Sequence, residues 1–235
     1  MRRFYWSLFL LLSFIVTLPV SWWVLTKVDF FYPTLHDVIN IDEHIKKYGP
    51  RNQMDRLDFE ISDKQTRVEL FHGIVEAIQN KGEGLEQLSY QNKQKQSVQL
   101  LTNAEIIHLQ DVANLLDTLK SVVIGAVLLW LVLILFIFFR RLKTPSTKQL
   151  LLNSMLILLI CSGILLLGPE KIFNQLHIWI FPDNHQWFFY YEDSLMSTMM
   201  KAPDLFGYIA AMWVLLSIGL TALLLQLCKK GGGAI

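Results

Sequence analysis

The stretch that decides the fold is LKSVVIGAVLLWLVLILFIFF, which spans Leu119–Phe139 and holds a single charged residue, Lys120. A helix needs about 20 apolar residues to cross the hydrocarbon core of a membrane, so this stretch is long enough. Three other stretches are comparable: Phe4–Thr26, Leu150–Leu167 and Leu205–Leu227. Hydrophobic residues make up 53% of the chain, more than an ordinary soluble domain carries. The sequence therefore predicts an α-helical integral membrane protein with four transmembrane helices.

The distribution of charge predicts how these helices are oriented. Basic residues without acidic neighbours occur at Arg2–Arg3, in 140–148 and at Lys229–Lys230, whereas all 20 acidic residues lie within Asp29–Asp117 or Glu170–Asp204. Short basic loops beside membrane spans mark the cytoplasmic side. We therefore expect both termini to be cytoplasmic and the two acidic segments to be extracytoplasmic.

These boundaries predict a domain organisation. The first helix has no small-residue cleavage site, so we expect an uncleaved anchor. The expected parts are a first transmembrane helix (1–26), an extracytoplasmic domain leading into helix 2 (27–118), a second transmembrane helix (119–139), a cytoplasmic loop (140–149), a third transmembrane helix (150–167), an aromatic-rich extracytoplasmic loop (168–204), a fourth transmembrane helix (205–228) and a cytoplasmic tail (229–235).

The first outer segment is predicted to be a small α+β cap. Ser62 and Asp63 resemble a helix start, and apolar residues follow at helical spacing as far as Ile78. Residues 85–90 and 97–101 are typical of two short strands around the polar turn 92–96.

A second helix start lies nearer the membrane. Thr102 and Glu105 form a T-x-x-E capping box, so a helix should begin near Asn103. Glu105, His108 and Asp111 are three residues apart, which places them on neighbouring turns of one face. Asp111 is therefore expected to orient the imidazole of His108 or to stabilise its charge.

The second outer segment gathers aromatic residues around His177, from Phe173 to Tyr191. Such density also suits an interfacial aromatic belt, in which His177 would be only an anchor. Asp183 and Asn184 are typical of a turn. The other histidines, namely His36, His44, His72 and His185, are expected to be solvated or locally hydrogen-bonded.

Several other chemistries are poorly supported. His108, Asp111, His177 and His185 could converge on zinc, but no H-x-x-x-H or H-E-x-x-H spacing supplies two ligands from one helix face. We expect no metal and no cofactor. The sequence has no G-x-S-x-G elbow, no glycine-rich phosphate loop and no basic patch that would suit nucleic acid, so no nucleic-acid partner is predicted.

The stretch Leu101-Thr-Asn-Ala-Glu105-Ile-Ile-His108-Leu-Gln-Asp111-Val112 resembles a known family element. It is similar to the E-x-x-H-x-x-D-V element of the bacterial lipoprotein intramolecular transacylase family, which also precedes the second of four spans. A second, more degenerate resemblance runs through Phe173, His177, Phe181, Trp187 and Ala202-Pro203-Asp204-Leu205-Phe206. Ile180 departs from it, because the family tends to have an aromatic residue there.

The resemblance implies an acyl transfer within one substrate molecule. The sn-2 acyl chain of an S-diacylglyceryl group would move to the α-amine of the lipoprotein's N-terminal cysteine, giving the lyso-form lipoprotein. It implies His108, His177 and Asp111 as catalytic residues. It also implies substrate contacts at Glu105, Phe181 and Trp187. We further expect Asn184 to contact the substrate, and either Asn184 or a backbone amide to donate to the oxyanion.

The expected partners are diacylglyceryl-modified lipoproteins and membrane lipids, at an active site on the extracytoplasmic face of the cell membrane. Two alternatives remain open at this stage. One is a non-catalytic membrane protein whose outer domain binds a partner, and the other is a metal-dependent membrane hydrolase. The oligomeric state does not follow from the sequence.

Overall fold

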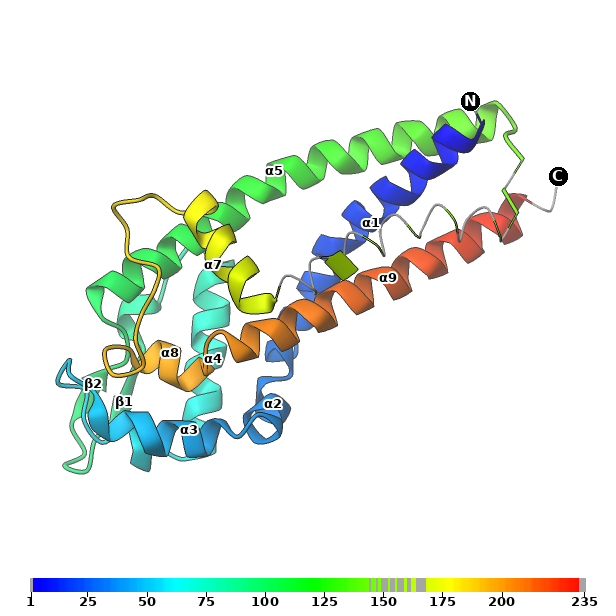
Figure 1. Ribbon diagram of the computed structural model, residues 1–235. Helices are drawn as coiled ribbons and strands as arrows, with labels where there is room; N and C mark the ends of the chain where they lie inside the picture. Colours follow the sequence, from blue (N-terminus) through cyan, green and yellow to red (C-terminus); the bar gives the residue numbers. More distant parts are fainter. Residues whose placement is uncertain are drawn as a thin grey trace. The chain divides into compact units, whose positions relative to one another are not determined.

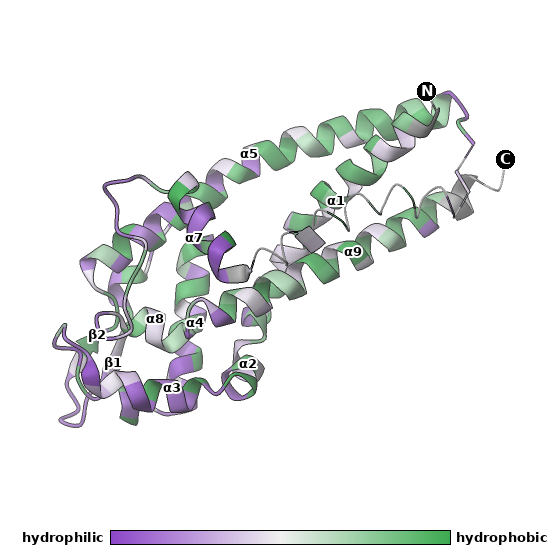
Figure 2. Ribbon diagram, in the orientation of Figure 1, coloured by the Kyte–Doolittle hydropathy of each residue, from purple (hydrophilic) through white to green (hydrophobic). Residues whose placement is uncertain are grey.

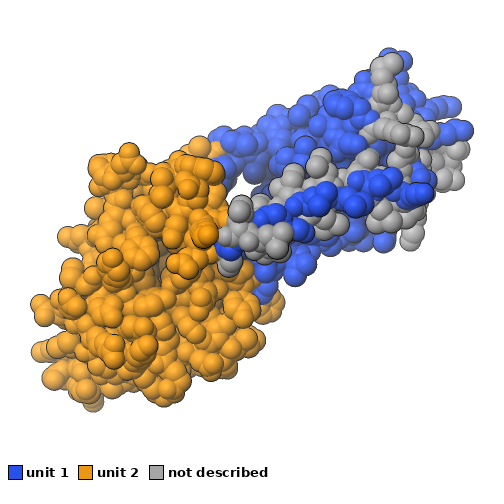
Figure 3. Space-filling model, in the orientation of Figure 1, with its two compact units in different colours: residues 1–24, 119–169, 210–235 blue, residues 25–118, 170–209 orange. Residues whose placement is uncertain are grey.

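The computed structural model describes residues 2–143, 145–146, 148, 152, 155, 159, 162–163 and 168–232 (Figure 1). The predicted third span, Leu150–Leu167, lies outside the described residues except at five scattered positions. The chain divides into two compact units (Figure 3). Unit 1 comprises residues 1–24, 119–169 and 210–235, and unit 2 comprises residues 25–118 and 170–209.

Three long apolar helices cover the other predicted spans. They are α1 (Arg2–Thr26), α5 (Asn103–Phe139) and α9 (Asp204–Gly232). The segments long and apolar enough to cross a membrane are Phe4–Thr26, Asn103–Phe139 and Asp204–Cys228. Figure 2 shows hydrophobic residues along α1 and along the later part of α5. The described part of the chain thus contains three candidate spans, each overlapping a predicted one.

Unit 1 is held together by an aromatic cluster and by polar contacts between helices. Trp6, Phe9 and Leu12 of α1 form a buried cluster with Leu133 of α5. Between α1 and α9, Ser217 Oγ donates to Ser21 Oγ at 2.9 Å, and the hydroxyls of Thr17 and Thr221 lie 2.9 Å apart. Small hydroxyl residues allow apolar helices to approach closely and satisfy each other's hydrogen bonds. Two tryptophans also donate hydrogen bonds to α1. Trp130 Nε1 donates to Ser13 Oγ at 2.8 Å, and Trp213 Nε1 donates to the Leu18 carbonyl at 2.7 Å.

Unit 2 contains the α+β elements predicted for the first outer segment. Helix α4 (Lys64–Gln79) begins where predicted, because the Asp63 side chain accepts a hydrogen bond from Thr66 N. Strands β1 (Ser89–Gln91) and β2 (Ser97–Gln99) form an antiparallel pair with Ser89 opposite Gln99. The first strand is shorter than predicted, since residues 85–87 form a 3₁₀ turn after Gly84, whose φ of 98° suits glycine.

Four further helices in unit 2 were not predicted. Two lie in the first outer segment, α2 (Tyr32–Val38) and α3 (Ile41–Tyr48). Two lie in the segment expected to be an aromatic-rich loop, α7 (Pro169–Ile180) and α8 (Leu195–Met200). Proline at the first helical position and Glu170 in the first turn favour the start of α7.

The core of unit 2 lies among α2, α4 and α8. The rings of Tyr32 and Phe71 stack with centroids 4.1 Å apart, and Tyr32 Oη donates to the Met199 carbonyl at 2.9 Å. Phe59 meets Tyr90 of β1 edge to face at 5.0 Å. Residues distant in sequence therefore share one core, which fixes the second outer segment against the first.

The guanidinium of Arg67 is buried in this unit and fully engaged. Its side chain is 2% exposed and donates to Asp42 Oδ1 at 2.7 Å. It also donates to the Glu60 carbonyl at 3.2 Å and to Ser62 Oγ at 3.0 Å. These bonds join α3, α4 and the turn between them.

Replacing Arg67 should therefore destabilise unit 2. We expect Arg67→Ala to lower the free energy of unfolding by about 3 kcal/mol, because the part-buried carbonyl of Glu60 and one oxygen of the Asp42 carboxylate lose their Arg67 donor and the buried side chain leaves a cavity. Lys46 makes a 2.6 Å ion pair with the same carboxylate but is largely exposed, so Lys46→Ala should change stability little. Denaturant unfolding in detergent, followed by circular dichroism, measures both; equal losses for the two variants would contradict the assignment.

Candidate active site

The capping box at the start of α5 is confirmed. Thr102 N donates to Glu105 Oε2 at 2.5 Å, and Glu105 N donates to Thr102 Oγ1 at 3.2 Å. The remaining carboxylate oxygen, Oε1, accepts from Ser194 Oγ at 2.5 Å. Glu105 is fully buried and its hydrogen bonds join the starts of α5 and α8, while its predicted contact with substrate stays a prediction.

His177 is fixed by its own helix. Its Nδ1 lies 2.7 Å from the Phe173 carbonyl, one turn earlier in α7. A carbonyl oxygen only accepts, so Nδ1 carries the proton and donates. In the neutral imidazole, Nε2 then keeps its lone pair and can accept a proton.

The two histidines singled out in the sequence lie together in unit 2. The ring centroids of His108, on α5, and His177, on α7, are 5.8 Å apart. Phe181 contacts both rings, at 4.9 Å from His108 and 5.1 Å from His177. Trp187 lies 5.0 Å from His177, and Phe189 lies 5.9 Å from His108. Aromatic rings thus enclose the pair.

This enclosure sets the electrostatics of the pair. His108 is only 8% exposed. Burial lowers the pKa of His177 below its ordinary value, and the bond to the Phe173 carbonyl opposes this in part. His177 is therefore neutral at neutral pH, which is the state that a general base needs.

Asp111 has a different hydrogen-bond partner from the expected one. Its Oδ2 lies 2.6 Å from Nδ1 of His185, for which the sequence predicted only a possible zinc ligand or a solvated or locally hydrogen-bonded residue. The i, i+3 spacing placed Asp111 near His108, but the long-range contact with His185 supplies the hydrogen bond. Nothing in the local sequence around His185 signals this pairing.

The remaining predicted residues differ in their settings. Phe181 and Trp187 are half-buried and contact the histidines, whereas Asn184 is exposed in the turn before His185. The role of Asn184 at an oxyanion stays a prediction. Among the described residues, no group of three His, Cys, Asp or Glu side chains could hold a metal ion.

Comparisons with known proteins bear on this geometry. Residues 4–202 match the family model for the lipoprotein intramolecular transacylase Lit. The chain belongs to this family. No curated protein matches the chain.

Solved structures of the membrane integral lipoprotein intramolecular transacylase Lit from Bacillus cereus share the fold. One matches with a TM-score of 0.68 at 16% identity, covering 98% of this chain and 95% of that one. A histidine-to-alanine variant matches with a TM-score of 0.65 at 15% identity, covering 98% and 92%. The three apolar helices, together with these membrane-integral relatives, identify a multi-pass membrane protein.

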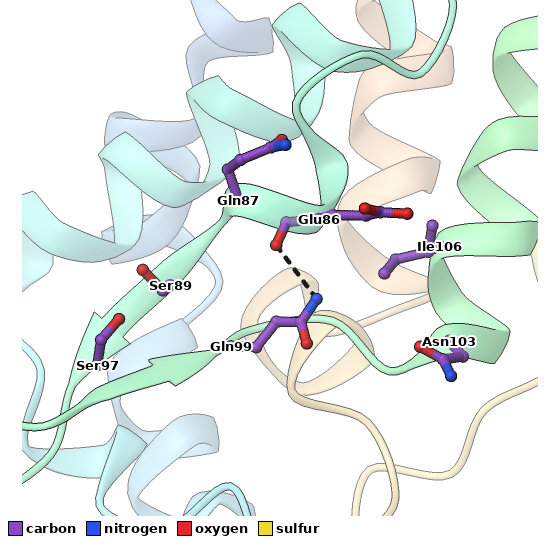
Figure 4. Close-up of a pocket in the computed structure, with 7 residues that line it drawn as sticks. All are labelled: Glu86, Gln87, Ser89, Ser97, Gln99, Asn103 and Ile106. Atoms are coloured by element: carbon purple, nitrogen blue, oxygen red, sulfur yellow. Dashed lines mark hydrogen bonds between the residues drawn. The ribbon is translucent and has the colours of Figure 1, made fainter.

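A separate cavity of about 580 Å³ opens elsewhere in unit 2 (Figure 4). It lies beside β1, β2 and the start of α5, and six of its seven lining residues are polar: Glu86, Gln87, Ser89, Ser97, Gln99 and Asn103. Gln99 Nε2 donates to the Glu86 carbonyl across it at 3.2 Å. Ile106 is its one apolar lining residue, so the cavity offers no apolar wall for an acyl chain.

The pKa values of His177 and His72 should be shifted in opposite directions from that of a free histidine. Burial lowers the pKa of His177, whereas the hydrogen bond that His72 donates to Asp29 raises the pKa of the half-exposed His72. Since an unfolded histidine has a pKa of about 6.5, stability contributed by His177 is lost as pH falls below that value. Stability contributed by His72 is full below about pH 6.5 and is lost as pH rises through its raised pKa. NMR titration of labelled imidazoles tests the order; a higher pKa for His177 than for His72 would refute it.

Proposed function

We propose that this member of the lipoprotein transacylase family moves the sn-2 acyl chain of an S-diacylglyceryl group to the α-amine of the N-terminal cysteine of a lipoprotein. The single observation that carries the proposal is the His108–His177 pair, with centroids 5.8 Å apart inside an aromatic enclosure. Ester-to-amide exchange needs no energy source, so proton transfer and positioning are what the protein must supply.

His177 acts as the base and then the acid. An α-amine has a pKa of about 7.7–8.0 and must lose a proton to attack. The amine nitrogen bonds to the ester carbonyl carbon while Nε2 of His177 takes its proton. The bond from that carbon to the glyceryl oxygen then breaks, and His177 returns the proton to this oxygen. The fixed Nδ1–H of His177 supports this direction of transfer.

His108 acts on the other reactant. A ring nitrogen that carries a proton donates to the ester carbonyl oxygen, where negative charge develops. Burial of His108 among Phe181 and Phe189 supports this role, because a hydrogen bond is stronger where water is excluded. Asp111 stabilises positive charge on the His108 ring through space. Asn184 is a candidate second donor to the carbonyl oxygen.

The aromatic residues hold the lipid part of the substrate. Phe181 and Trp187 present apolar faces beside His177, where an acyl ester can lie against them. Holding amine and ester about 3–3.5 Å apart makes the attack effectively unimolecular. Glu105 contributes indirectly, by holding the starts of α5 and α8 together.

The proposed topology has four spans with both termini in the cytoplasm. Residues 27–118 and 168–204 lie outside the cell membrane, so the histidine pair works at the extracytoplasmic face on lipoproteins anchored there. The basic residues of 140–148 and the acidic residues of both outer segments support this orientation.

Loss of either histidine should stop the reaction. We expect His177→Ala and His108→Ala each to lower kcat by at least about 100-fold, which is the usual contribution of a positioned acid or base. The measurement is mass spectrometry of the acylated N-terminal peptide after incubation with a diacylglyceryl lipopeptide. His72→Ala, in an exposed histidine, should retain full activity. Full activity of either active-site variant would remove that histidine from the mechanism.

Cysteine accessibility tests the topology. In a chain whose native Cys161 and Cys228 are replaced by serine, Gln94→Cys in the exposed turn between β1 and β2 should react with a membrane-impermeant thiol reagent in intact cells. Lys143→Cys should react only after the membrane is opened. The reverse pattern would invert the proposed orientation.

A further inference from the structure

The segment Phe181–Ser194 connects α7 to α8 without a helix or strand of its own. It nevertheless carries most of the aromatic wall around the histidines, through Phe181, Trp187 and Phe189. Such a segment depends on side-chain contacts for its position, because it lacks the hydrogen-bond ladders of regular structure.

The far end of this segment is well anchored. Gln53 N donates to the Glu192 carbonyl at 2.8 Å, and Tyr191 Oη donates to the Ala202 carbonyl at 2.5 Å. Ser194 Oγ is held by the buried carboxylate of Glu105. These contacts fix residues 191–194 but lie beyond the aromatic residues that cover the histidine pair.

In the part of the chain that the structure describes, a hydrogen bond between His185 and Asp111 joins the middle of the segment to α5. His185 Nδ1 and Asp111 Oδ2 are 2.6 Å apart, and their side chains are 33% and 17% exposed. Asp111 lies one turn beyond His108 on the same helix, and His185 lies two residues before Trp187. The pair therefore fastens the aromatic wall to the helix that carries His108.

We propose that the Asp111–His185 pair is a latch that holds residues 181–190 over the reacting groups and so decides between transfer and hydrolysis. This inference rests on the proposed function and assigns His185 as a positioning residue. With the latch closed, the acyl carbon meets only the α-amine. With it open, water reaches the same carbon.

The two outcomes differ in their products. In transfer, the amine nitrogen bonds to the acyl carbon, the bond to the glyceryl oxygen breaks, and a proton passes from nitrogen to that oxygen. In hydrolysis, the oxygen of water bonds to the acyl carbon, the same bond breaks, and the proton from water goes to the glyceryl oxygen. Hydrolysis releases a free fatty acid and leaves the α-amine unacylated, so mass spectrometry separates the two.

The test is a graded series at position 185 of the full-length protein, reconstituted in vesicles with a diacylglyceryl lipopeptide. We expect His185→Ala to raise the ratio of hydrolysed to transferred product about 5-fold, the population change that loss of one partly buried hydrogen bond of about 1 kcal/mol brings. His185→Gln, whose amide can donate to Asp111, should give an intermediate ratio. His185→Asp should give the highest ratio, because like charges then face each other.

The matched control is His72→Ala, since His72 makes a similar pair with Asp29 at 2.8 Å away from the histidine pair. The control should keep the parent ratio. A parent-like ratio in both His185→Ala and His185→Asp would overturn the latch. A parent protein that forms no lyso-form product would instead refute the proposed function.

Hydrogen exchange tests the latch without relying on turnover. In His185→Ala, amides of residues 181–190 should exchange about 5-fold faster, while those of α4 keep their rates. Unchanged exchange in 181–190 would overturn the proposal even if activity were lost. Equal acceleration in α4 would also overturn it, because His185 would then stabilise the whole unit and not one segment.

Discussion

The buried carboxylate of Glu105 is the constraint on which the site depends. A buried charge is costly unless hydrogen bonds satisfy it, and here the backbone of Thr102 and the hydroxyl of Ser194 do so. Ser194 in turn accepts from Ser197 N and caps α8. One side chain therefore begins α5 and fixes α8 against it, although the two segments are 89 residues apart. Because His108 lies one turn after Glu105, its position follows from the same contact.

The two imidazoles share one aromatic environment, but different contacts hold each ring in place. His177 Nδ1 donates a hydrogen bond to a carbonyl of its own helix, α7, and this bond sets the tautomer of the ring. His108 is held by packing against rings that come from the second outer segment. The arrangement of the two imidazoles therefore depends on both chain segments of unit 2 staying folded together, and the shared core of α2, α4 and α8 joins these segments.

The parts of the fold that could be predicted are those with a local physical signature. The cap at Asp63, the capping box at Thr102 and the long apolar stretches each combine a recognisable pattern with a nearby hydrogen bond or a length requirement. Helices α2 and α3 were not predicted, although Pro33 in the first turn of α2 and the acidic first turn of α3 favour a helix start. The residues before them, Phe31 and Asn40, adopt left-handed backbone conformations and make no side-chain cap, which the sequence alone does not show. Helix α7 was not predicted because its aromatic density also matched an interfacial belt.

The same distinction explains what could be predicted of the site. His108 and His177 could be identified from their positions beside apolar stretches and from the family resemblance. The pairing of Asp111 with His185 joins residues 74 positions apart, and no local sequence pattern indicates it. The helical spacing correctly placed Asp111 on the face of His108, yet proximity along a helix does not decide which partner completes a hydrogen bond. A carboxylate between two histidines binds the one whose ring nitrogen reaches it. Here that ring belongs to His185, in the segment between α7 and α8. Asp111 can then influence the charge at His108 while its hydrogen bond holds another segment. A carboxylate one turn from a histidine on a helix therefore need not be the group that orients its ring.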